Sequence, residues 1–269
     1  MVPVGVIHSP VQSQKEMPAL GLDGEIELFP FFAEALEGIQ AHSHILVIGW
    51  MHRADRTVHR AVPRKISPDL PEKGVFALRS PSRPNPISVT VAALSGVREG
   101  RFLDVSFLDL IDKTPVLDIK PYQAGIDCVF SATGPDRSGT IAKITPERCR
   151  DDLVREAVGF HGEYCPALAV AVRMMIAATR FMGGDLRREE ISCSLGPDPC
   201  INDALIGITG ARFGTGRLII PKSWPDPPVY AISGPKVRLE FSIVSIPRET
   251  GLVDAAPDEA LFLIRTRSE

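Results

Sequence analysis

Two arginines, Arg79 and Arg83, stand four residues apart in the stretch GVFALRSPSRPNP, which begins at residue 74. The stretch also holds three prolines, which lack a backbone N–H and have a restricted φ. We therefore expect GVFAL to form a short buried strand and the remainder a rigid loop. Two guanidiniums and the amide of Asn85 on a rigid loop suit the binding of a planar or anionic group. The alternative is a solvated turn whose arginines pair with nearby carboxylates.

A second polar stretch, DLIDKTPVLDIKPY, covers residues 109–122. On a strand, Asp118, Lys120 and Tyr122 share one face, because side chains alternate with a period of two. Burying such a row is costly unless the groups pair. The row therefore suits a polar active-site wall with an acid–base group. The alternative is a solvated barrel face that carries an ion pair between residues two apart.

The segment HGEYCP could carry a metal or reactive-thiol site. Pro166 suits the first position of a helix, which places Cys165 at or near the N-cap. A helix N-terminus favours the thiolate form of a cysteine placed there. His161 precedes this cysteine by four residues, and Cys200 and Asp203 follow downstream, where they could converge on it. His161, Cys165 and Cys200 are the predicted metal ligands, and the alternative is a buried cysteine that packs a helix start.

Composition bounds the class of protein. The 269 residues suffice for one large domain or two ordinary ones, and a hydrophobic content of 44% allows a core. The formal net charge of −3 provides no global basic field for nucleic acid, although a local patch would suffice. Five cysteines without a C-x-x-C pair fit a reducing compartment, so we expect a cytoplasmic protein. The sequence shows neither a signal peptide nor a membrane span.

The first half predicts short, closely spaced strands and almost no helix. The expected strands lie at residues 2–7, 25–28, 45–51, 74–78, 87–94 and 102–108 and within 109–122, with one or two helical turns at 31–39. This spacing, together with the turn residues between the strands, predicts an antiparallel β-barrel or sandwich.

The character of the sequence changes around residues 131–150, where SATGPDRSGT is typical of a linker. The elements expected after it are helices at 151–158 and 166–182, a short helix capped by Asn202 and Asp203, and strands at 237–244 and 260–266. We therefore predict a mainly β domain at 1–140 and a smaller α+β domain at 150–269.

Four motifs of the first half together resemble one family. GVIHSP, HSHILVIGWMH, GVFALRSPSRPNPI and DLIDKTPVLDIKPY follow in this order within about the first 130 residues. RSxxRPNP combined with DxTPxxDIKPY is long and unusual, and the set is similar to the TsaA-like (TrmO-like) family. The resemblance implies one antiparallel β-barrel that binds S-adenosylmethionine, usually as a homodimer. In the family, the bacterial enzyme methylates N6 of a threonylcarbamoyl-adenosine next to the anticodon of tRNA.

The resemblance also implies which residues contact the cofactor. They come from four segments, namely the loop after the first strand, the residues after the central strand, the RSxxRPNP loop with the strand that follows it, and the DLxDxTP loop. The corresponding residues are Pro18, Ala19, Leu20, His52, Arg53, Arg79, Val89, Leu110, Ile111, Asp112 and Thr114. The charge of Asp112 suits a cationic sulfonium. Two glycines common in the family are replaced here by Ser88 and Lys113.

Catalytic and substrate roles are predicted for polar residues beside these segments. Asp118 could accept the proton that N6 loses as it becomes nucleophilic, and Lys120 and Tyr122 complete the predicted catalytic set. Arg83 and Asn85 are predicted to hold a phosphate, base or carboxylate of the substrate.

The second half resembles the FmdE-like family more weakly. HGEYCPALAVAVRMM is similar to the helix start of that family, and CINDALIGITGARFGTGRLII to its second motif. In that family these residues are linked to a metal or thiol site, so the resemblance implies a zinc-like metal as a second cofactor. The sequence departs from the pattern at Glu163, where the family has a second histidine, and at Ala211, where it has a cysteine.

Two classes of function follow from these observations. The first is an S-adenosylmethionine-dependent N-methyltransferase, with tRNA as its partner or, alternatively, a small-molecule or metal-linked substrate. The second is a non-enzymatic sensor in which the barrel binds S-adenosylmethionine and the second half binds a metal. Salt-sensitive tRNA binding would favour the RNA enzyme, whereas stoichiometric zinc without methyl transfer would favour the sensor.

Overall fold

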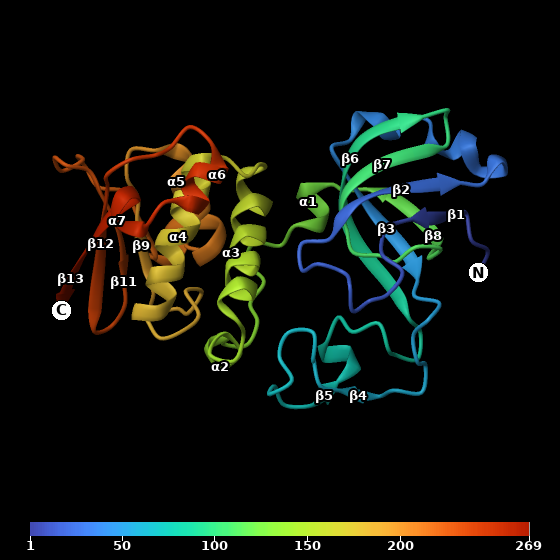
Figure 1. Cartoon of the computed structure of the whole chain (residues 1–269), viewed down its shortest axis with the longest axis horizontal. Coiled ribbons are helices and arrows are strands. Elements are labelled where there is room, and N and C mark those ends of the chain that lie inside the picture. The colour runs from blue at the N-terminus through green and yellow to red at the C-terminus, as the bar shows by residue number, and fades with distance from the viewer. Residues whose placement is uncertain (269) are drawn as a thin grey trace. The chain divides into compact units, whose positions relative to one another are not determined.

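The computed structural model describes residues 1–268, and the chain forms two compact units, Met1–Ser131 and Ala132–Glu269 (Figure 1). The predicted domain ranges place this division later in the chain. Residues 131–140, expected to be a linker, include the start of the helix α2 (Ser138–Ile141), and α3 (Pro146–His161) follows soon after.

The first unit is a closed barrel of six strands in the order β1-β2-β7-β6-β3-β8, all paired antiparallel. The strands are β1 (Gly5–His8), β2 (Leu22–Leu28), β3 (His44–Trp50), β6 (Ile87–Arg98), β7 (Phe102–Leu108) and β8 (Pro115–Pro121). The predicted barrel is therefore confirmed.

Alternating side chains fill the barrel. In β3, Ile45 and Val47 are fully buried, while their neighbours along the strand are partly exposed, as the two-residue period requires. The interior also receives Ile7 from β1, Ile26 from β2 and Leu103 from β7, all with no exposed surface. Such a barrel is a packed core rather than a channel, so binding must take place at its ends or on its outer face.

Strand directions decide which loops meet. Because every pairing is antiparallel, β1, β3 and β7 run in one direction and β2, β6 and β8 in the other. The β1–β2, β3–β6 and β7–β8 connections therefore lie at the same end of the barrel. The β2–β3 connection, with its 3-10 helices Pro30–Leu36 and Ile39–Ala41, lies at the other end.

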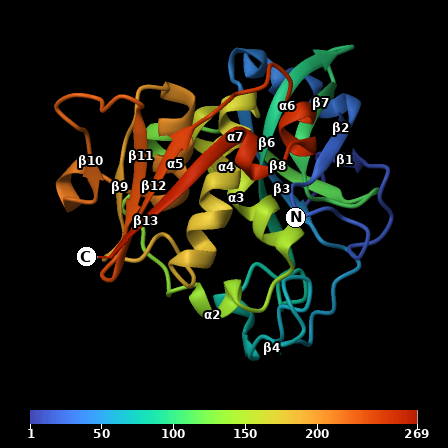
Figure 2. The same ribbon diagram turned by 60° about the vertical axis from the view of Figure 1, so that its left-hand side comes forward.

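The β3–β6 connection, residues 51–86, forms an arm that projects from the barrel (Figures 1 and 2). Its two short strands, β4 (Arg60–Ala61) and β5 (Lys73–Gly74), pair antiparallel. The strand predicted for GVFAL is wrong, because Val75–Ala77 forms a 3-10 helix instead. Only Val75 in that helix is buried, and Phe76 is 84% exposed, so the apolar run does not form a core strand.

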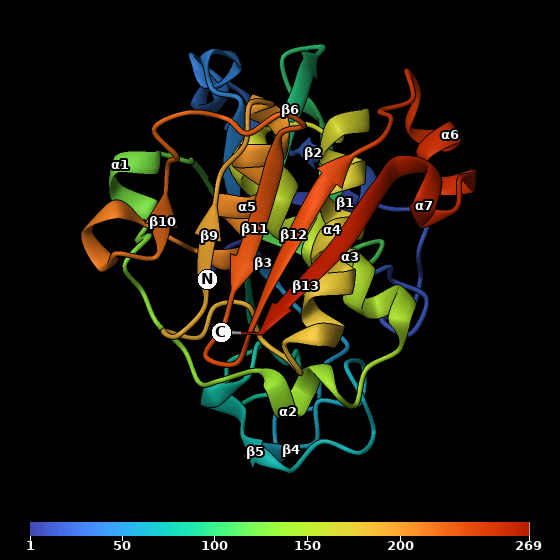
Figure 3. The ribbon, with the colours of Figure 1, turned by 90° about the vertical axis from the view of Figure 1, so that its left-hand side faces the viewer.

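The second unit packs three helices on a five-stranded sheet. The helices α3, α4 (Pro166–Phe181) and α5 (Pro199–Thr209) contact one another, and Figure 3 shows them behind the sheet. The sheet has the order β10-β9-β11-β12-β13, with strands β9 (Ser192–Ser194), β10 (Leu218–Ile219), β11 (Val229–Ser233), β12 (Val237–Ile243) and β13 (Phe262–Ser268). Three short helices, α1 (Ala124–Asp127) in the first unit and α6 (Thr250–Ala255) and α7 (Asp258–Leu261) in the second, complete the chain. The predicted α+β architecture is confirmed.

Helix starts in the second unit follow from capping residues. Cys165 is the N-cap of α4, as predicted, and Pro166 occupies its first position. The cap predicted for α5 at Asn202 and Asp203 is wrong, because the helix already starts at Pro199. Asp198 caps it by accepting a hydrogen bond from the N–H of Ile201 at 3.0 Å.

Among residues 1–268, none of the helices combines the length and the apolar character that crossing a bilayer requires.

Replacing Gly21 by alanine should destabilise the barrel more than replacing Gly38. Both glycines have a positive φ, +78° and +84°, which costs an alanine about 1 kcal/mol. At Gly21 a Cβ would also lie 2.7 Å from the carbonyl carbon of Phe107, whereas nothing lies within 4 Å at Gly38. We expect Gly38→Ala to lower the free energy of unfolding by about 1 kcal/mol and Gly21→Ala by clearly more, measured by urea unfolding. Equal losses would contradict the close approach between the β1–β2 loop and β7.

Candidate functional site

A cavity of about 200 Å³ lies where the three connections of the barrel end meet. All three contribute to its wall, which consists of Gln14 from the β1–β2 connection, Met51, Arg53, Ala54, Pro81 and Ser82 from the arm, and Leu110, Ile111 and Thr114 from the β7–β8 connection. Most of the lining is apolar, and its polar atoms come from a few side chains, as is typical of small-molecule sites.

The carboxylate of Asp112 joins two of these connections. It accepts hydrogen bonds from the N–H of Ser9 at 3.2 Å and from Nε2 of Gln12 at 3.1 Å, and its own N–H donates to the carbonyl of Val11 at 2.8 Å. Burial raises the pKa of the Asp112 carboxyl, but the bonds from Gln12 and Ser9, with the charge of Lys113, outweigh it and the pKa is lowered. Asp112 is therefore a firmly ionised group in the turn that borders the cavity.

The turn after Asp112 has a tightly defined backbone. Lys113 has a φ of +61°, a conformation that favours glycine, which is the residue the resemblance leads us to expect there. Its N–H donates to the carbonyl of Ile7 at 2.9 Å. The buried hydroxyl of Thr114 donates to the carbonyl of Ile111 at 2.6 Å. These bonds hold the turn against β1 and shape the floor of the cavity.

The arm is tied to the barrel end by arginines. Arg53 donates from Nη1 to the carbonyl of Gln12 at 2.6 Å, which links the arm to the β1–β2 connection. Its neighbour His52 is largely exposed. The pKa of the His52 imidazole is lowered, first because part of the ring is buried and second because of the charge of Arg53. Arg79 donates to the carbonyl of Val89 at 2.5 Å, so the structure brings these two predicted residues together on the outer face of β6.

The predicted substrate residue Arg83 forms a staple within its own loop. Its guanidinium donates to the carbonyls of Ser80 at 2.9 Å and Val75 at 2.7 Å, and also to that of Leu78. The alternative interpretation expected this arginine to pair with a carboxylate, but its partners are backbone carbonyls. Asn85 is exposed, beside the start of β6.

The predicted cofactor residues divide into two groups. Four of them, Arg53, Leu110, Ile111 and Thr114, line the cavity, while Pro18, Ala19, Leu20, His52, Arg79, Val89 and Asp112 lie outside the lining. The five remaining lining residues, Gln14, Met51, Ala54, Pro81 and Ser82, were not among the predicted cofactor residues, although Gln14 was one of two candidates, with Gln12, for a glutamine that the family has in its first loop. Each missed residue lies within a motif or loop already singled out, so the proximity of these loops was the signal that could have identified them.

The predicted catalytic residues Asp118, Lys120 and Tyr122 follow one another along β8 and directly after it, in the direction away from the cavity end. β8 starts at the cavity end with Pro115 and runs toward the other end, where the N–H of Tyr122 donates to the carbonyl of His44 at 3.0 Å. At about 3.3 Å per residue, Tyr122 is about 23 Å along the strand from Pro115. Asp118 and Lys120 form a half-exposed ion pair at 2.7 Å, which matches the alternative of a solvated face. Burial, followed by the neighbouring Cys128, raises the pKa of the Tyr122 phenol.

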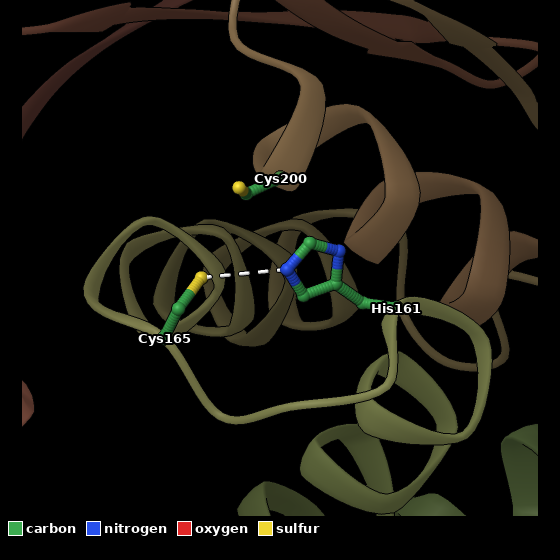
Figure 4. Close-up of side chains that lie close together, drawn as sticks. All are labelled: His161, Cys165 and Cys200. Carbon is green, nitrogen blue, oxygen red and sulfur yellow. Dashed lines mark hydrogen bonds between the residues drawn. The ribbon is translucent and has the colours of Figure 1, made fainter.

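A second cluster lies in the C-terminal unit, where His161, Cys165 and Cys200 offer ligand atoms that all lie within 4.8 Å of one another (Figure 4). Each comes from a helix end, His161 from the last position of α3, Cys165 from the N-cap of α4 and Cys200 from the first turn of α5. The structure therefore brings together all three residues predicted as metal ligands.

Hydrogen bonds orient the cluster. Nε2 of His161 lies 3.6 Å from Sγ of Cys165, and Nδ1 of His161 lies 3.0 Å from Oδ2 of Asp203. A carboxylate on Nδ1 leaves Nε2 free to act as a ligand, as is common around metal-binding histidines. Burial, followed by the neighbouring Cys165 thiol, raises the pKa of Cys200 to about 11, so the thiol stays protonated at neutral pH unless a cation is bound.

Each half of the chain matches a known protein family. Residues 6–128 match the family described as tRNA-methyltransferase O (TrmO) N-terminal domain. A protein of Archaeoglobus fulgidus, named a probable S-adenosyl-L-methionine-binding protein, is 36% identical over 263 residues, which cover 89% of this chain and 69% of the relative. The chain belongs to the TrmO family. Residues 160–225 also match the family described as FmdE, molybdenum formylmethanofuran dehydrogenase operon.

Other relatives cover the first unit of this TrmO-family chain. A second Archaeoglobus fulgidus protein, named an S-adenosyl-L-methionine-binding protein, is 41% identical over 49% of this chain and 95% of its own length. An Escherichia coli protein named tRNA (adenine(37)-N6)-methyltransferase is 33% identical over 53% of this chain and 63% of its own length. A crystal structure of TrmO is 38% identical over 49% of this chain and 58% of that chain, with a TM-score of 0.40. The predicted family resemblance is confirmed.

Acid should remove a stabilising contribution of Asp112. Its pKa is lowered in the folded state, so the carboxylate stabilises the fold above its unfolded pKa of about 3.9, and this contribution is lost as the pH falls through the folded pKa. Asp112→Asn should therefore be less stable than the wild type at neutral pH, and the difference should shrink below about pH 4. Urea unfolding across this pH range measures it. A difference that is independent of pH would contradict the role of the charge.

Proposed function

We propose that the N-terminal unit binds S-adenosylmethionine in the cavity at the barrel end and transfers its methyl group to N6 of threonylcarbamoyl-adenosine in tRNA. The observation that carries this proposal is the meeting of three separate connections around one cavity in a member of the TrmO family. The names of the relatives from Archaeoglobus fulgidus and Escherichia coli support binding of the cofactor and methylation of tRNA adenine, respectively.

The residues present fit this cofactor. When bound, S-adenosylmethionine supplies an electrophilic methyl group on a cationic sulfonium. Met51, Leu110 and Ile111 offer apolar surface for its uncharged parts, and the ionised Asp112 borders the same turn. The cavity is smaller than the roughly 300–1,000 Å³ of typical ligand pockets, so it would enclose one part of the cofactor and leave the other in the mouth between the loops.

The protein's share of the reaction is chiefly positioning. An in-line approach of N6 to the methyl carbon gains most from holding the two reactants in a dry, defined geometry. Thr114, Asp112 and Arg53 fix the backbone of the three connections through the bonds described above, so the walls of the cavity are set before the substrate binds. As N6 bonds to the methyl carbon it must lose a proton, which requires an acceptor.

We keep Asp118 as the proposed proton acceptor, with Lys120 and Tyr122 as its neighbours. Asp118 is half-exposed and paired only with Lys120, so it is accessible to a substrate that lies along the outer face of β8. This assignment rests on the family resemblance. Loss of turnover in Asp118→Asn, with cofactor binding unchanged, is its test.

We also propose that the protein acts as a homodimer through the outer face of the barrel. Val89 and Val91 are 47% and 44% exposed on neighbouring outward positions of β6, which β3 separates from the strand that carries Asp118. Contiguous exposed apolar side chains mark interaction surfaces. The mass of the protein in sedimentation equilibrium tests this proposal.

Filling the cavity, or removing the side chain of Arg79, should weaken binding of S-adenosylmethionine. Ala54 lines the cavity, so Ala54→Trp would occupy its volume, and Arg79→Ala would remove the arginine that the family resemblance places at the cofactor. We expect each change to weaken S-adenosylmethionine binding at least about tenfold, or about 1.4 kcal/mol, in calorimetric titration.

The matched control is Arg98→Ala, because Arg98 ends β6 at the other end of the barrel, where it pairs with Asp104 at 2.8 Å. It should bind the cofactor like the wild type. A wild type that binds no S-adenosylmethionine would contradict the methyltransferase, whereas binding without transfer to tRNA would point to the small-molecule substrate or to the sensor.

We propose a second function for the C-terminal unit, the binding of a zinc-like cation by His161, Cys165 and Cys200. With Zn–S of about 2.3 Å and Zn–N of about 2.0–2.1 Å, tetrahedral ligand atoms lie about 3.3–3.8 Å apart. The 3.6 Å between Cys165 and His161 already meets this spacing. Three protein ligands leave a fourth position for water or a substrate, as in catalytic rather than structural zinc sites.

Removal of either thiol should remove the metal. Mass spectrometry of the purified protein should find about one zinc per chain in the wild type and clearly less in Cys165→Ser or Cys200→Ser. Asp203→Asn should weaken zinc binding about 10- to 100-fold, as loss of a carboxylate behind a ligating histidine does. Cys149→Ser is the control, because Cys149 lies on α3 outside the cluster. Equal metal content in all variants would contradict the site.

A further inference from the structure

The arm, residues 51–86, carries a charge opposite to that of the whole chain. Its eight basic residues against three carboxylates make a formal net charge of +5, whereas the chain has −3. The basic residues are Arg53, Arg56, Arg60, Arg64, Lys65, Lys73, Arg79 and Arg83, and all except Arg83 are exposed. The basic field that the overall composition lacks is therefore concentrated in one segment at the cavity end of the barrel.

Most of this charge is held in place without being neutralised. Arg53, Arg56 and Arg79 donate to backbone carbonyls, those of Gln12, Pro84 and Val89, which are uncharged acceptors. Arg60 differs from these three, since it pairs with Glu72 at 2.8 Å. Guanidiniums anchored in this way keep N–H groups and full charge for a ligand at a small entropic cost.

Lys73 and Arg64 extend the same field along the arm. Both side chains are exposed, and neither forms an ion pair with any residue that the structure describes. Lys73 lies in β5, directly before the 3-10 helix that starts at Val75.

The arm also carries an exposed aromatic ring, that of Phe76, on a turn that hydrogen bonds hold in place. Phe76 is 84% exposed, while its neighbour Val75 is 2% exposed and anchors the turn. The N–H of Val75 donates to the carbonyl of His59 at 3.0 Å, and Arg83 bonds the carbonyls of Val75 and Leu78 on either side of the ring. A single exposed phenylalanine is ordinary. An exposed ring on a turn held by hydrogen bonds, within a segment of formal net charge +5, has the two components of a surface for single-stranded nucleic acid.

We propose that the arm is the RNA-binding surface of this protein, with Phe76 stacking on an unpaired base and the arginines and lysines of the arm contacting phosphates. The inference rests on the proposed function and deepens it, because it assigns the contact with tRNA to the whole arm. The arm contains the predicted cofactor residues His52, Arg53 and Arg79 and the predicted substrate residues Arg83 and Asn85, but Phe76, Arg64 and Lys73 had no predicted role. An anticodon loop offers both partners, since its bases are unpaired and its backbone is charged.

The arm also connects RNA binding to the cavity. Pro81 and Ser82 line the cavity and belong to the same loop as Arg83, which bonds to the carbonyls of Val75 and Leu78 in the turn that carries Phe76. A nucleotide loop bound along the arm therefore lies beside the mouth of the cavity, where a base must arrive to receive a methyl group.

The test compares RNA binding by the full chain for two probes of equal length, a fluorescein-labelled RNA stem-loop and an RNA duplex. Phe76→Ala should weaken stem-loop binding about 5- to 150-fold, the usual effect of losing one stacked base, and leave duplex binding nearly unchanged. Arg64→Glu and Lys73→Glu should weaken binding of both probes and make the salt dependence shallower, by about 0.7–0.9 in log–log slope for each phosphate that the protein no longer neutralises.

Two controls match these changes in type but not in place. Phe31→Ala removes a ring that is 89% exposed at the other end of the barrel, and Lys236→Glu reverses an exposed charge in the C-terminal unit. Both should bind the stem-loop like the wild type. Calorimetric titration with S-adenosylmethionine should give the wild-type affinity for all five variants, because none of these residues lines the cavity.

The outcomes separate this inference from the proposed function. If the wild type methylates tRNA while Phe76→Ala and the charge reversals bind the stem-loop normally, the arm is not the RNA surface and the methyltransferase stands. If the variants lose stem-loop binding but the wild type transfers no methyl group, the arm binds RNA and the proposed activity is wrong. A Phe76→Ala protein that changes its mass in sedimentation would show that the ring is a subunit contact, which overturns the inference.

Discussion

Closure of the six-stranded barrel is the constraint on which the first unit depends. With every pair antiparallel, the ends of β1, β3 and β7 must lie at one end, so three connections far apart in the chain become neighbours. The hydrogen bonds of Asp112 then join two of these connections, and Arg53 joins the third. The barrel core is filled by aliphatic side chains. Its contribution is to hold the ends of the strands in a fixed arrangement.

The second unit positions its polar residues by a different device, the ends of helices. His161, Cys165 and Cys200 each occupy a terminal position, where a short segment lets the chain reverse and a cap defines the backbone. Packing of α3 and α4 against α5 brings these termini together. Asp203 lies three residues after Cys200 on α5, on the same face, and so faces the histidine rather than the solvent alone. Each of these three side chains is thus supported by an element longer than the cluster itself.

Local patterns predicted the parts of this structure that depend on local physics. A short apolar run rich in β-branched residues identified β3, strand propensity identified β6, and the Cys-Pro pair identified the start of α4. The strand expected at GVFAL failed because a short apolar run does not reveal whether its side chains reach a core, and Phe76 does not. Period two correctly grouped Asp118 with Lys120, yet it carries no information about which end of the barrel a strand approaches. The cavity wall depends on the pairing of distant strands, so no single motif could specify it.

The arm leaves the barrel after Trp50 and returns at Ile87, two residues that face each other across the β3–β6 ladder. Paired residues of neighbouring strands are only about 5 Å apart, so the whole excursion begins and ends at almost one point. A segment with adjoining ends can lengthen, shorten or change composition at little cost to the surrounding sheet. With the proposed role of the arm in binding RNA, the choice of methyl acceptor would evolve as a module, by exchange of the tip of the arm, while the barrel and the other two loops that shape the cavity stay as they are.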